Sequence, residues 1–138
     1  MAQMTELEQR VLSELEEARA EEACTLINTV FQPSGTNQEA AEFITALIAL
    51  IQRRMAVMST FTDLGRWSDA SEVTSIEMAG ELAAHLRFDE AAKLWRDSRD
   101  PGPPNKAYLP MVACTDAGRK RAFEVLDQRG YQWWRKKA

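Results

Sequence analysis

A segment rich in proline and glycine near residue 100 is the strongest constraint on how this chain can fold. It reads Asp100-Pro101-Gly102-Pro103-Pro104-Asn105. Proline cannot donate a backbone hydrogen bond, and glycine, aspartate and asparagine favour turns, so the segment excludes regular helix and strand. We therefore predict a turn here, between a short strand that begins at Leu94 and a second strand within Ala107–Cys114.

The second strand leads into a basic helix. Pro110 lies inside the strand, which predicts an edge strand, because proline cannot complete the hydrogen-bond ladder on both sides. Thr115 or Asp116 can cap a final helix over Ala117–Arg129. Gly130 follows, and glycine is the residue type that most often ends a helix.

Two helices are predicted in the N-terminal half, each opened by a capping box in which a hydroxyl and a carboxylate satisfy free backbone amides. The first box is Thr5–Glu8, and an apolar stripe with helical spacing follows over Thr5–Phe31, opposite a glutamate-rich face. The second box, Thr36–Glu39, opens the most apolar segment, Glu39–Met58. A helix that is apolar on nearly every side is surrounded by other elements, so we expect it at the centre of the fold.

Further helices are predicted before the proline-rich segment. Ser71 or Thr74 can cap a third helix that runs to about Leu86. Asp89 can cap a short helical stretch that contains Ala91, Ala92, Leu94 and Trp95. Residues 60–67 are expected to connect the second and third helices.

These elements predict a single, mainly α domain with a small two-stranded hairpin. Its 138 residues suffice for one hydrophobic core. Residues 1–35 are expected to form the acidic helix and turn, residues 36–130 the helical core with the hairpin, and residues 131–138 an aromatic and basic tail. The tail could stack on nucleic acid, or it could cover the core with its tryptophans.

The segment Leu94–Arg121 resembles the wing of winged helix-turn-helix regulators of the MarR and PadR kind. The matching residues are Leu94 and Arg96 in the first strand, Asp100-Pro101 in the turn, and Thr115-Asp116-Ala117-Gly118-Arg119 at the start of the helix. The absence of a side chain at Gly118 would let the helix start approach the hairpin closely. The resemblance implies a winged-helix-like C-terminal half and binding to double-stranded DNA.

In these families a recognition helix precedes the wing and reads base edges in the major groove. Counting back from the wing assigns this role to Ser71–Leu86, whose charged positions are Glu72, Glu77 and Glu81. Phosphates repel carboxylates, so this helix departs from the family pattern. In a second alignment with the family pattern, Asp89–Arg99 is the reading helix. This alignment leaves no residues for the first strand of the wing, which is predicted to begin at Leu94.

The charge of the chain changes sign along its length. Residues 1–85 carry five arginines and fourteen carboxylates, whereas residues 86–138 carry twelve lysines and arginines and seven carboxylates. A basic half can gather around phosphates even though the net charge is −4. The residues predicted to contact DNA are Lys93, Arg96, Arg99, Lys106, Arg119, Lys120 and Arg121. In the alternative interpretation the acidic half packs against the basic half and screens it, in one chain or in a dimer.

The acidic N-terminal helix is the predicted site for a protein partner, through Glu16, Glu17, Glu21 and Glu22. Such a terminal helix can also supply a dimer interface, which predicts a homodimer, or it can pack onto the central helix of the same chain. Two functions follow from these features. One is a non-enzymatic DNA-binding regulator, and the other is a small interaction module, an adaptor or inhibitor, that does not bind DNA.

The sequence does not indicate an enzyme. His85 is the only histidine, a phosphate-binding glycine loop is absent, and Cys24 and Cys114 lack neighbours that would activate a thiol. No apolar run is long enough to span a bilayer, and the N-terminus lacks the pattern of a secretion signal. We therefore expect a cytoplasmic protein with reduced cysteines and without a metal, a cofactor or a membrane partner.

Overall fold

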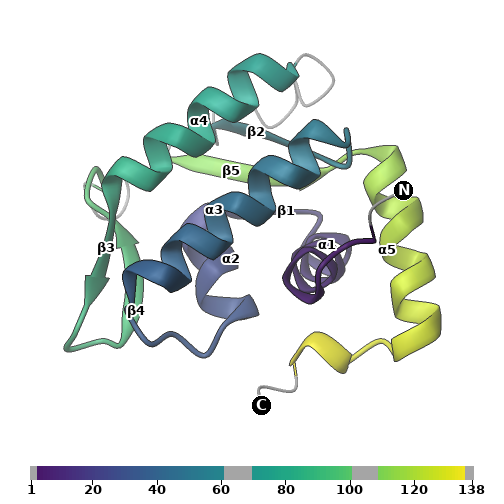
Figure 1. The fold of residues 1–138 in the computed structure, drawn as a ribbon, viewed down its shortest axis with the longest axis horizontal. Coiled ribbons are helices and arrows are strands. Elements are labelled where there is room, and N and C mark those ends of the chain that lie inside the picture. The colour runs from purple at the N-terminus through teal and green to yellow at the C-terminus, as the bar shows by residue number, and fades with distance from the viewer. Residues whose placement is uncertain (1–2, 61–69, 101–108, 136–138) are drawn as a thin grey trace.

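The computed structural model in Figure 1 describes residues 3–60, 70–100 and 109–135. The helices of these residues are α1 (Glu6–Ala18), α2 (Ala23–Val30), α3 (Asn37–Gln52), α4 (Glu72–His85), α5 (Asp116–Arg129) and the short 3-10 helix η2 (Trp133–Arg135). One antiparallel sheet has the order β1-β5-β2, formed by Ala20–Glu22, Pro110–Cys114 and Ala56–Thr60. A separate hairpin pairs β3 (Leu86–Asp89) with β4 (Leu94–Asp97). The mainly α character with small antiparallel sheets confirms the predicted fold class at this level.

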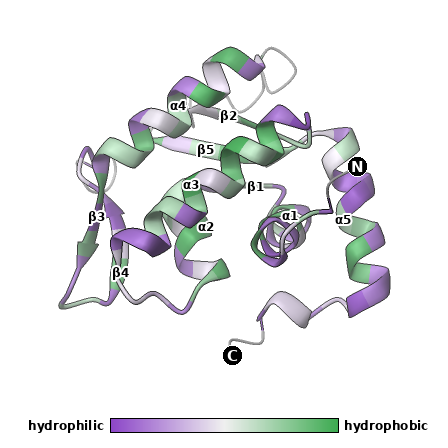
Figure 2. Cartoon of the chain, in the orientation of Figure 1, coloured by the Kyte–Doolittle hydropathy of each residue, from purple (hydrophilic) through white to green (hydrophobic). Residues whose placement is uncertain are grey.

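The apolar helix predicted at the centre of the fold is α3. It lies between α4 and α1, while α5 and the β3–β4 hairpin lie at opposite ends of the molecule (Figure 1). Phe43, Leu47 and Leu50 on α3 have no exposed surface. Figure 2 shows hydrophilic residues at both ends of α3 and hydrophobic ones between them. The middle of α3 therefore anchors the core, and its ends reach the surface.

The single long helix predicted over Thr5–Phe31 is wrong, because a short strand separates α1 from α2. Arg19 ends α1 with a φ of 71°, outside the helical region. The next three residues form β1, in which Ala20 lies opposite Ala113 of β5. In β1 the backbone hydrogen bonds go to β5, which is remote in sequence, instead of to the preceding turn of a helix. The spacing of apolar residues in the segment gives no sign of this pairing.

The second predicted helix, Glu39–Met58, is too long at its C-terminal end. α3 ends at Gln52, Arg54 turns the chain with a φ of 61°, and β2 follows. In β2 the alternating residues Ala56 and Met58 are each 1% exposed. The apolar residues of this segment thus follow the two-residue period of a strand that pairs with β5.

The predicted hairpin joins the wrong strands. β4 begins at Leu94 as predicted, but it pairs with β3, where Phe88 lies opposite Trp95. β5, predicted as an edge strand, is the central strand of the other sheet. Pro110 is tolerated because it is the first residue of β5, a position where a missing amide hydrogen does little harm.

The short helix predicted after Asp89 is a turn between β3 and β4. Asp89 does act as a cap, because its Oδ1 accepts hydrogen bonds of 3.0 Å from the amides of Ala91 and Ala92. The same capping chemistry serves a tight turn here rather than a helix. The interpretation of Asp89–Arg99 as a reading helix is therefore wrong. Lys106 and most of the proline-rich segment lie outside the described residues.

The predicted caps of the other helices are confirmed. Thr36 accepts a hydrogen bond from the amide of Glu39 at the start of α3, and Ser71 accepts one from the amide of Thr74 at the start of α4. Thr115 accepts one of 3.0 Å from the amide of Gly118. Gly130 ends α5 with a φ of 98°.

The close approach predicted at Gly118 is confirmed, although the neighbouring chain is not the predicted hairpin. A Cβ atom at Gly118 would lie 1.9 Å from the carbonyl oxygen of Met55. The same oxygen accepts a hydrogen bond of 3.0 Å from the amide of Thr115. The start of α5 is thus pressed against the turn between α3 and β2.

The C-terminal tail covers the core with its tryptophans, which was one of the two predicted alternatives. Trp133 and Trp134 are 8% and 2% exposed. Their indole nitrogens donate to α1, that of Trp133 to Ser13 at 3.1 Å and that of Trp134 to Glu14 at 2.9 Å.

Replacing Gly118 with alanine is expected to destabilise the protein, because the new methyl group would overlap the backbone of Met55. We expect a loss of about 1–3 kcal/mol in the free energy of unfolding, measured in urea. Gly80, in α4, is the matched control, since nothing lies within 4 Å of a Cβ built there. Gly80→Ala should stabilise the protein by about 0.5–1 kcal/mol. Equal effects at the two glycines would contradict this interpretation of the packing.

Candidate functional site

One face of α3 presents exposed side chains along its N-terminal half. We call this face the α3 strip, and its members are Asn37, Gln38, Ala41, Glu42 and Thr45, all exposed. Their spacing of three to four residues places them on one side of the helix, away from the buried Phe43 and Leu47. Gln38 and Glu42 contact each other, since the Gln38 amide nitrogen donates to a Glu42 carboxylate oxygen at 3.0 Å.

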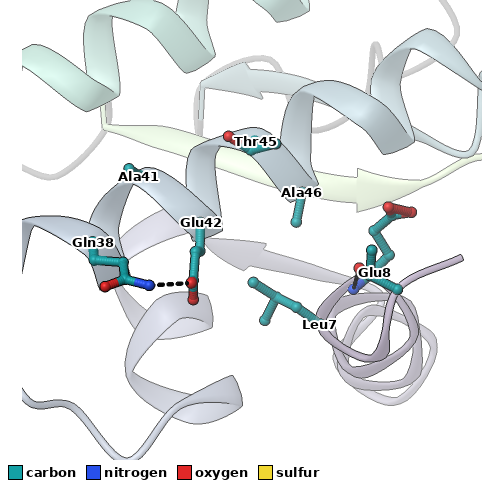
Figure 3. Close-up of a pocket in the computed structure, with 8 residues that line it drawn as sticks. Leu7, Glu8, Gln38, Ala41, Glu42, Thr45 and Ala46 are labelled. Atoms are coloured by element: carbon teal, nitrogen blue, oxygen red, sulfur yellow. Dashed lines mark hydrogen bonds between the residues drawn. The ribbon is translucent and has the colours of Figure 1, made fainter.

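A groove of about 580 Å³ runs between the α3 strip and the start of α1. Leu7 faces the strip from α1, and the Gln38 amide points to Glu42 (Figure 3). Glu8 also lines the groove, where the guanidinium of Arg53 pairs with its carboxylate at 3.3 Å. The strip is therefore open to solvent along this side.

The turn before α3 is held by a buried carboxylate, that of Glu39, which is 7% exposed. It accepts hydrogen bonds from the amides of Ser34 and Gly35 at 3.1 and 3.2 Å, and one of 2.6 Å from the indole nitrogen of Trp95 in β4. Burial alone would raise the pKa of Glu39, but these hydrogen bonds outweigh it and hold the pKa below its ordinary value. One charged group thus joins the start of α3 to the hairpin.

Two further contacts fix the hairpin to the α2–α3 unit. The side-chain amide of Asn28 in α2 donates to the carbonyl oxygen of Trp95 at 3.0 Å and accepts from its amide at 2.8 Å. Gly35, with a φ of 79°, touches the ring of Phe88, and a Cβ there would lie 2.5 Å from that ring. The hairpin and the N-terminus of α3 therefore form one rigid surface.

The hairpin packs against α3 and carries three exposed basic residues, of which Arg87 adjoins the α3 strip. Arg87 and Asn37 line the same hollow of about 310 Å³ between α3, α4 and the hairpin. Lys93 pairs with Glu90 at 3.4 Å, and Arg96 pairs with Asp89 at 2.8 Å. These pairs are solvated and contribute little to stability, so both cations can turn toward another anion.

Arg99, also predicted to contact DNA, has a structural role in the protein. It pairs with Asp97 at 2.7 Å and with Glu81 at 3.5 Å, and the Asp97 side chain is only 1% exposed. The hydrogen bonds with Asp97 raise the pKa of Arg99. Burial acts to raise the pKa of Asp97, yet its hydrogen bonds to Arg99 leave it lowered. This guanidinium neutralises a buried carboxylate.

The basic residues of α5 lie at the end of the molecule opposite the hairpin (Figure 1). Arg119 pairs with Glu16 at 2.9 Å, and Arg121 pairs with Glu124 at 2.7 Å. Lys120 is exposed and has no ion-pair partner in the described part of the chain. The described residues predicted to contact DNA therefore fall into two separate groups, and of the two only the hairpin that carries Lys93 and Arg96 packs against α3.

The glutamates predicted to bind a partner are largely engaged within the chain. Glu16 binds Arg119, and Glu17 binds Arg135 of the tail. Glu22 lies in β1 opposite Met111. Acidic residues of the N-terminal half thus pair with basic residues of the C-terminal half, as the alternative interpretation of the charge asymmetry supposes.

Glu21 is the exception, because it lies beside other carboxylates instead of a cation. One of its oxygens is buried without a hydrogen-bond partner in the described structure. Burial raises the pKa of Glu21 to about 8, and the hydrogen bond with Glu14 and the charges of Glu14 and Glu17 add to this effect. Glu21 therefore carries a proton at neutral pH.

The described residues show no feature of a thiol or metal centre. Burial raises the pKa of both Cys24 and Cys114 to about 12, which keeps the thiols protonated. No group of three or more His, Cys, Asp or Glu side chains in this part of the chain is placed to hold a metal ion. Helices long and apolar enough to cross a bilayer are also absent from it.

Comparison of the chain with family models, with curated proteins and with solved structures finds no match. The α3 strip was not among the residues singled out from the sequence. Its signal was nevertheless present, since Asn37, Gln38 and Glu42 are polar residues in the first half of a mainly apolar helix.

Replacing Glu39 with glutamine should loosen the hairpin from α3, because the new amide group would place a donor against the donors of Ser34, Gly35 or Trp95. We expect a loss of about 1–3 kcal/mol in the free energy of unfolding, measured in urea at pH 7. Glu42→Gln, an exposed change on the same helix, is the control and should change little. Equal losses in the two variants would contradict the role given to Glu39.

The protonated state of Glu21 predicts a pH dependence of stability. Its folded pKa of about 8 lies above the ordinary value of 4.5, so the folded protein keeps a proton that the unfolded chain releases. Its stabilising contribution is full below pH 4.5, falls as the pH rises, and levels off above about pH 8. Urea unfolding between pH 5 and 9 should show this decline, and Glu21→Gln should flatten it, whereas the exposed Glu90→Gln should not. An unchanged slope in Glu21→Gln would refute the assignment.

Proposed function

We propose that this protein is a non-enzymatic, DNA-binding regulator of winged-helix type. In this proposal α3 lies in the major groove and the β3–β4 hairpin contacts the DNA backbone. The observation that carries it is the exposed polar α3 strip, which lies beside Arg87 of a basic hairpin that is fixed to the same helix.

The order of the elements supports the assignment of α3 as the reading helix. β2 and β5 are antiparallel neighbours, and β5 leads into α5 through the run Thr115–Arg119 that resembles the winged-helix pattern. If β2 and β5 are the strands of the wing, the helix directly before them is α3, preceded by α2 and a short turn that contains Gly35. The acidic α4 then belongs to the connection between β2 and β5, and the proposal does not place it in the major groove of DNA.

The basic residues near α3 are few, so the proposed face can make only a small number of phosphate contacts. The β3–β4 hairpin together with Arg99 carries four basic residues and three carboxylates, and Arg99 is occupied by Asp97. Arg87 lies beside α3, and Lys93 and Arg96 are exposed on the same hairpin, so we assign the phosphate contacts to these three residues. We therefore expect modest affinity that weakens steeply with added salt, as counterion release requires.

The alternative of an adaptor that works through the N-terminal glutamates has less support. Glu16 and Glu17 bind arginines of the same chain, and Glu21 is protonated and partly buried. A partner would have to displace these internal contacts before it could use the acidic face. Such displacement costs the internal ion pairs, whereas the α3 strip is open without any rearrangement.

The DNA-binding proposal predicts that reversing the hairpin charges weakens binding. For Lys93→Glu/Arg96→Glu we expect a loss of more than about tenfold in affinity for a mixed-sequence duplex in 50 mM salt, measured by fluorescence anisotropy, and a shallower salt dependence. Lys120→Glu, at the other end of the molecule, is the matched control and should bind as the unmodified protein does.

Two results would overturn this proposal. One is the absence of binding to any duplex at low salt by a protein whose circular dichroism shows it to be folded. The other is a loss of affinity in Lys120→Glu as large as that in the hairpin variant, because this would place the DNA on α5.

A further inference from the structure

The side chains of the α3 strip indicate which bases the helix can read. Resting on the proposed function, we infer that α3 recognises A·T base pairs in the major groove, with Gln38 as the adenine-reading residue and Glu42 as the residue that positions it. The inference goes beyond DNA binding as such, because phosphate contacts carry no sequence information.

Four of the five residue types on the strip match adenine or thymine, and the fifth, Glu42, which could accept a hydrogen bond from cytosine N4, is engaged by Gln38. Asparagine and glutamine amides form paired hydrogen bonds with the N7 and N6 atoms of adenine, whereas guanine is read by arginine or lysine at O6 and N7. α3 contains no arginine or lysine between Asn37 and Gln52. Ala41 and Thr45, both exposed, offer methyl groups that suit the thymine C5 methyl.

The hydrogen bond between Gln38 and Glu42 fixes the orientation of the reading amide. Glu42 as a carboxylate can only accept, so the 3.0 Å contact must come from the amide nitrogen of Gln38. This bond uses one of the two amide hydrogens. The other hydrogen and the carbonyl oxygen remain for a base, and they provide the donor and the acceptor that adenine N7 and N6 require.

The position of Gln38 suits this role. Asn37 and Gln38 are the first two residues of α3, and in helix-turn-helix proteins the N-terminal residues of the reading helix contact base edges. The next residue is Glu39, whose hydrogen bonds to Ser34, Gly35 and Trp95 hold this end of the helix. The amide is thus presented from a rigid support, which lowers the entropy lost when a base is bound.

The experiment compares anisotropy titrations with two duplexes of equal length, one rich in A·T pairs and one in which these are replaced by G·C. We expect the unmodified protein to prefer the A·T duplex by about five- to a hundredfold. Gln38→Ala should remove most of the preference. Gln52→Ala, at the exposed far end of α3, is the control and should keep it. Replacing adenine with 7-deazaadenine, which lacks the N7 acceptor but keeps base pairing, should likewise remove most of the preference for the A·T duplex.

The variant Glu42→Ala separates two effects of this carboxylate, its orientation of the Gln38 amide and its repulsion of DNA phosphates. Removing this carboxylate from the DNA-facing side should raise the affinity for both duplexes, while the A·T preference falls because the amide of Gln38 is no longer oriented. Equal binding of the two duplexes by the unmodified protein overturns the inference and leaves the proposed function standing. An unchanged preference in Gln38→Ala, or with 7-deazaadenine, also overturns it. Failure to bind either duplex overturns both proposals.

Discussion

The arrangement of the proposed DNA-binding face depends on the buried carboxylate of Glu39. It stays ionised in a nearly solvent-free position because two backbone amides and the indole of Trp95 donate to it. These donors come from the turn before α3 and from β4, so a single side chain sets the start of the helix and the place of the hairpin together. This link, together with the Asn28–Trp95 hydrogen bonds and the Gly35–Phe88 contact, holds the exposed strip of α3 and the hairpin in one surface.

Many charged side chains in the described part of the chain neutralise one another in pairs. Cations of the C-terminal half bind carboxylates of the N-terminal half, as in the pairs Arg119 with Glu16 and Arg129 with Glu6. These contacts lie between α1 and α5, and they explain why a basic half does not produce a broad basic face. The hairpin differs, because Lys93 and Arg96 pair with neighbours on the same hairpin and remain exposed.

Local chemistry in the sequence was sufficient to predict the helix caps at Thr36 and Thr115, because each depends on residues next to it. The small size of Gly118 predicted a close approach, but not its partner Met55, which is remote in the sequence. The strands β1 and β2 could not be predicted, since their hydrogen bonds are made with β5 and their turns use Arg19 and Arg54, residue types that seldom adopt a positive φ. The candidate site followed the same rule. Asn37 and Gln38 could be read from the sequence, but the role proposed for them depends on the pairing of β2 with β5, which in the proposal makes α3 the helix before the wing.

Amide hydrogen exchange in the presence and absence of a mixed-sequence duplex tests the central claim most directly, because it locates the DNA on the protein without any substitution. The proposed face predicts added protection in residues 37–45 of α3 and 87–96 of the hairpin, and unchanged exchange in residues 119–121 of α5. Protection confined to α5, or to the glutamates of α1, would contradict the claim that α3 and the hairpin together form the DNA-binding surface.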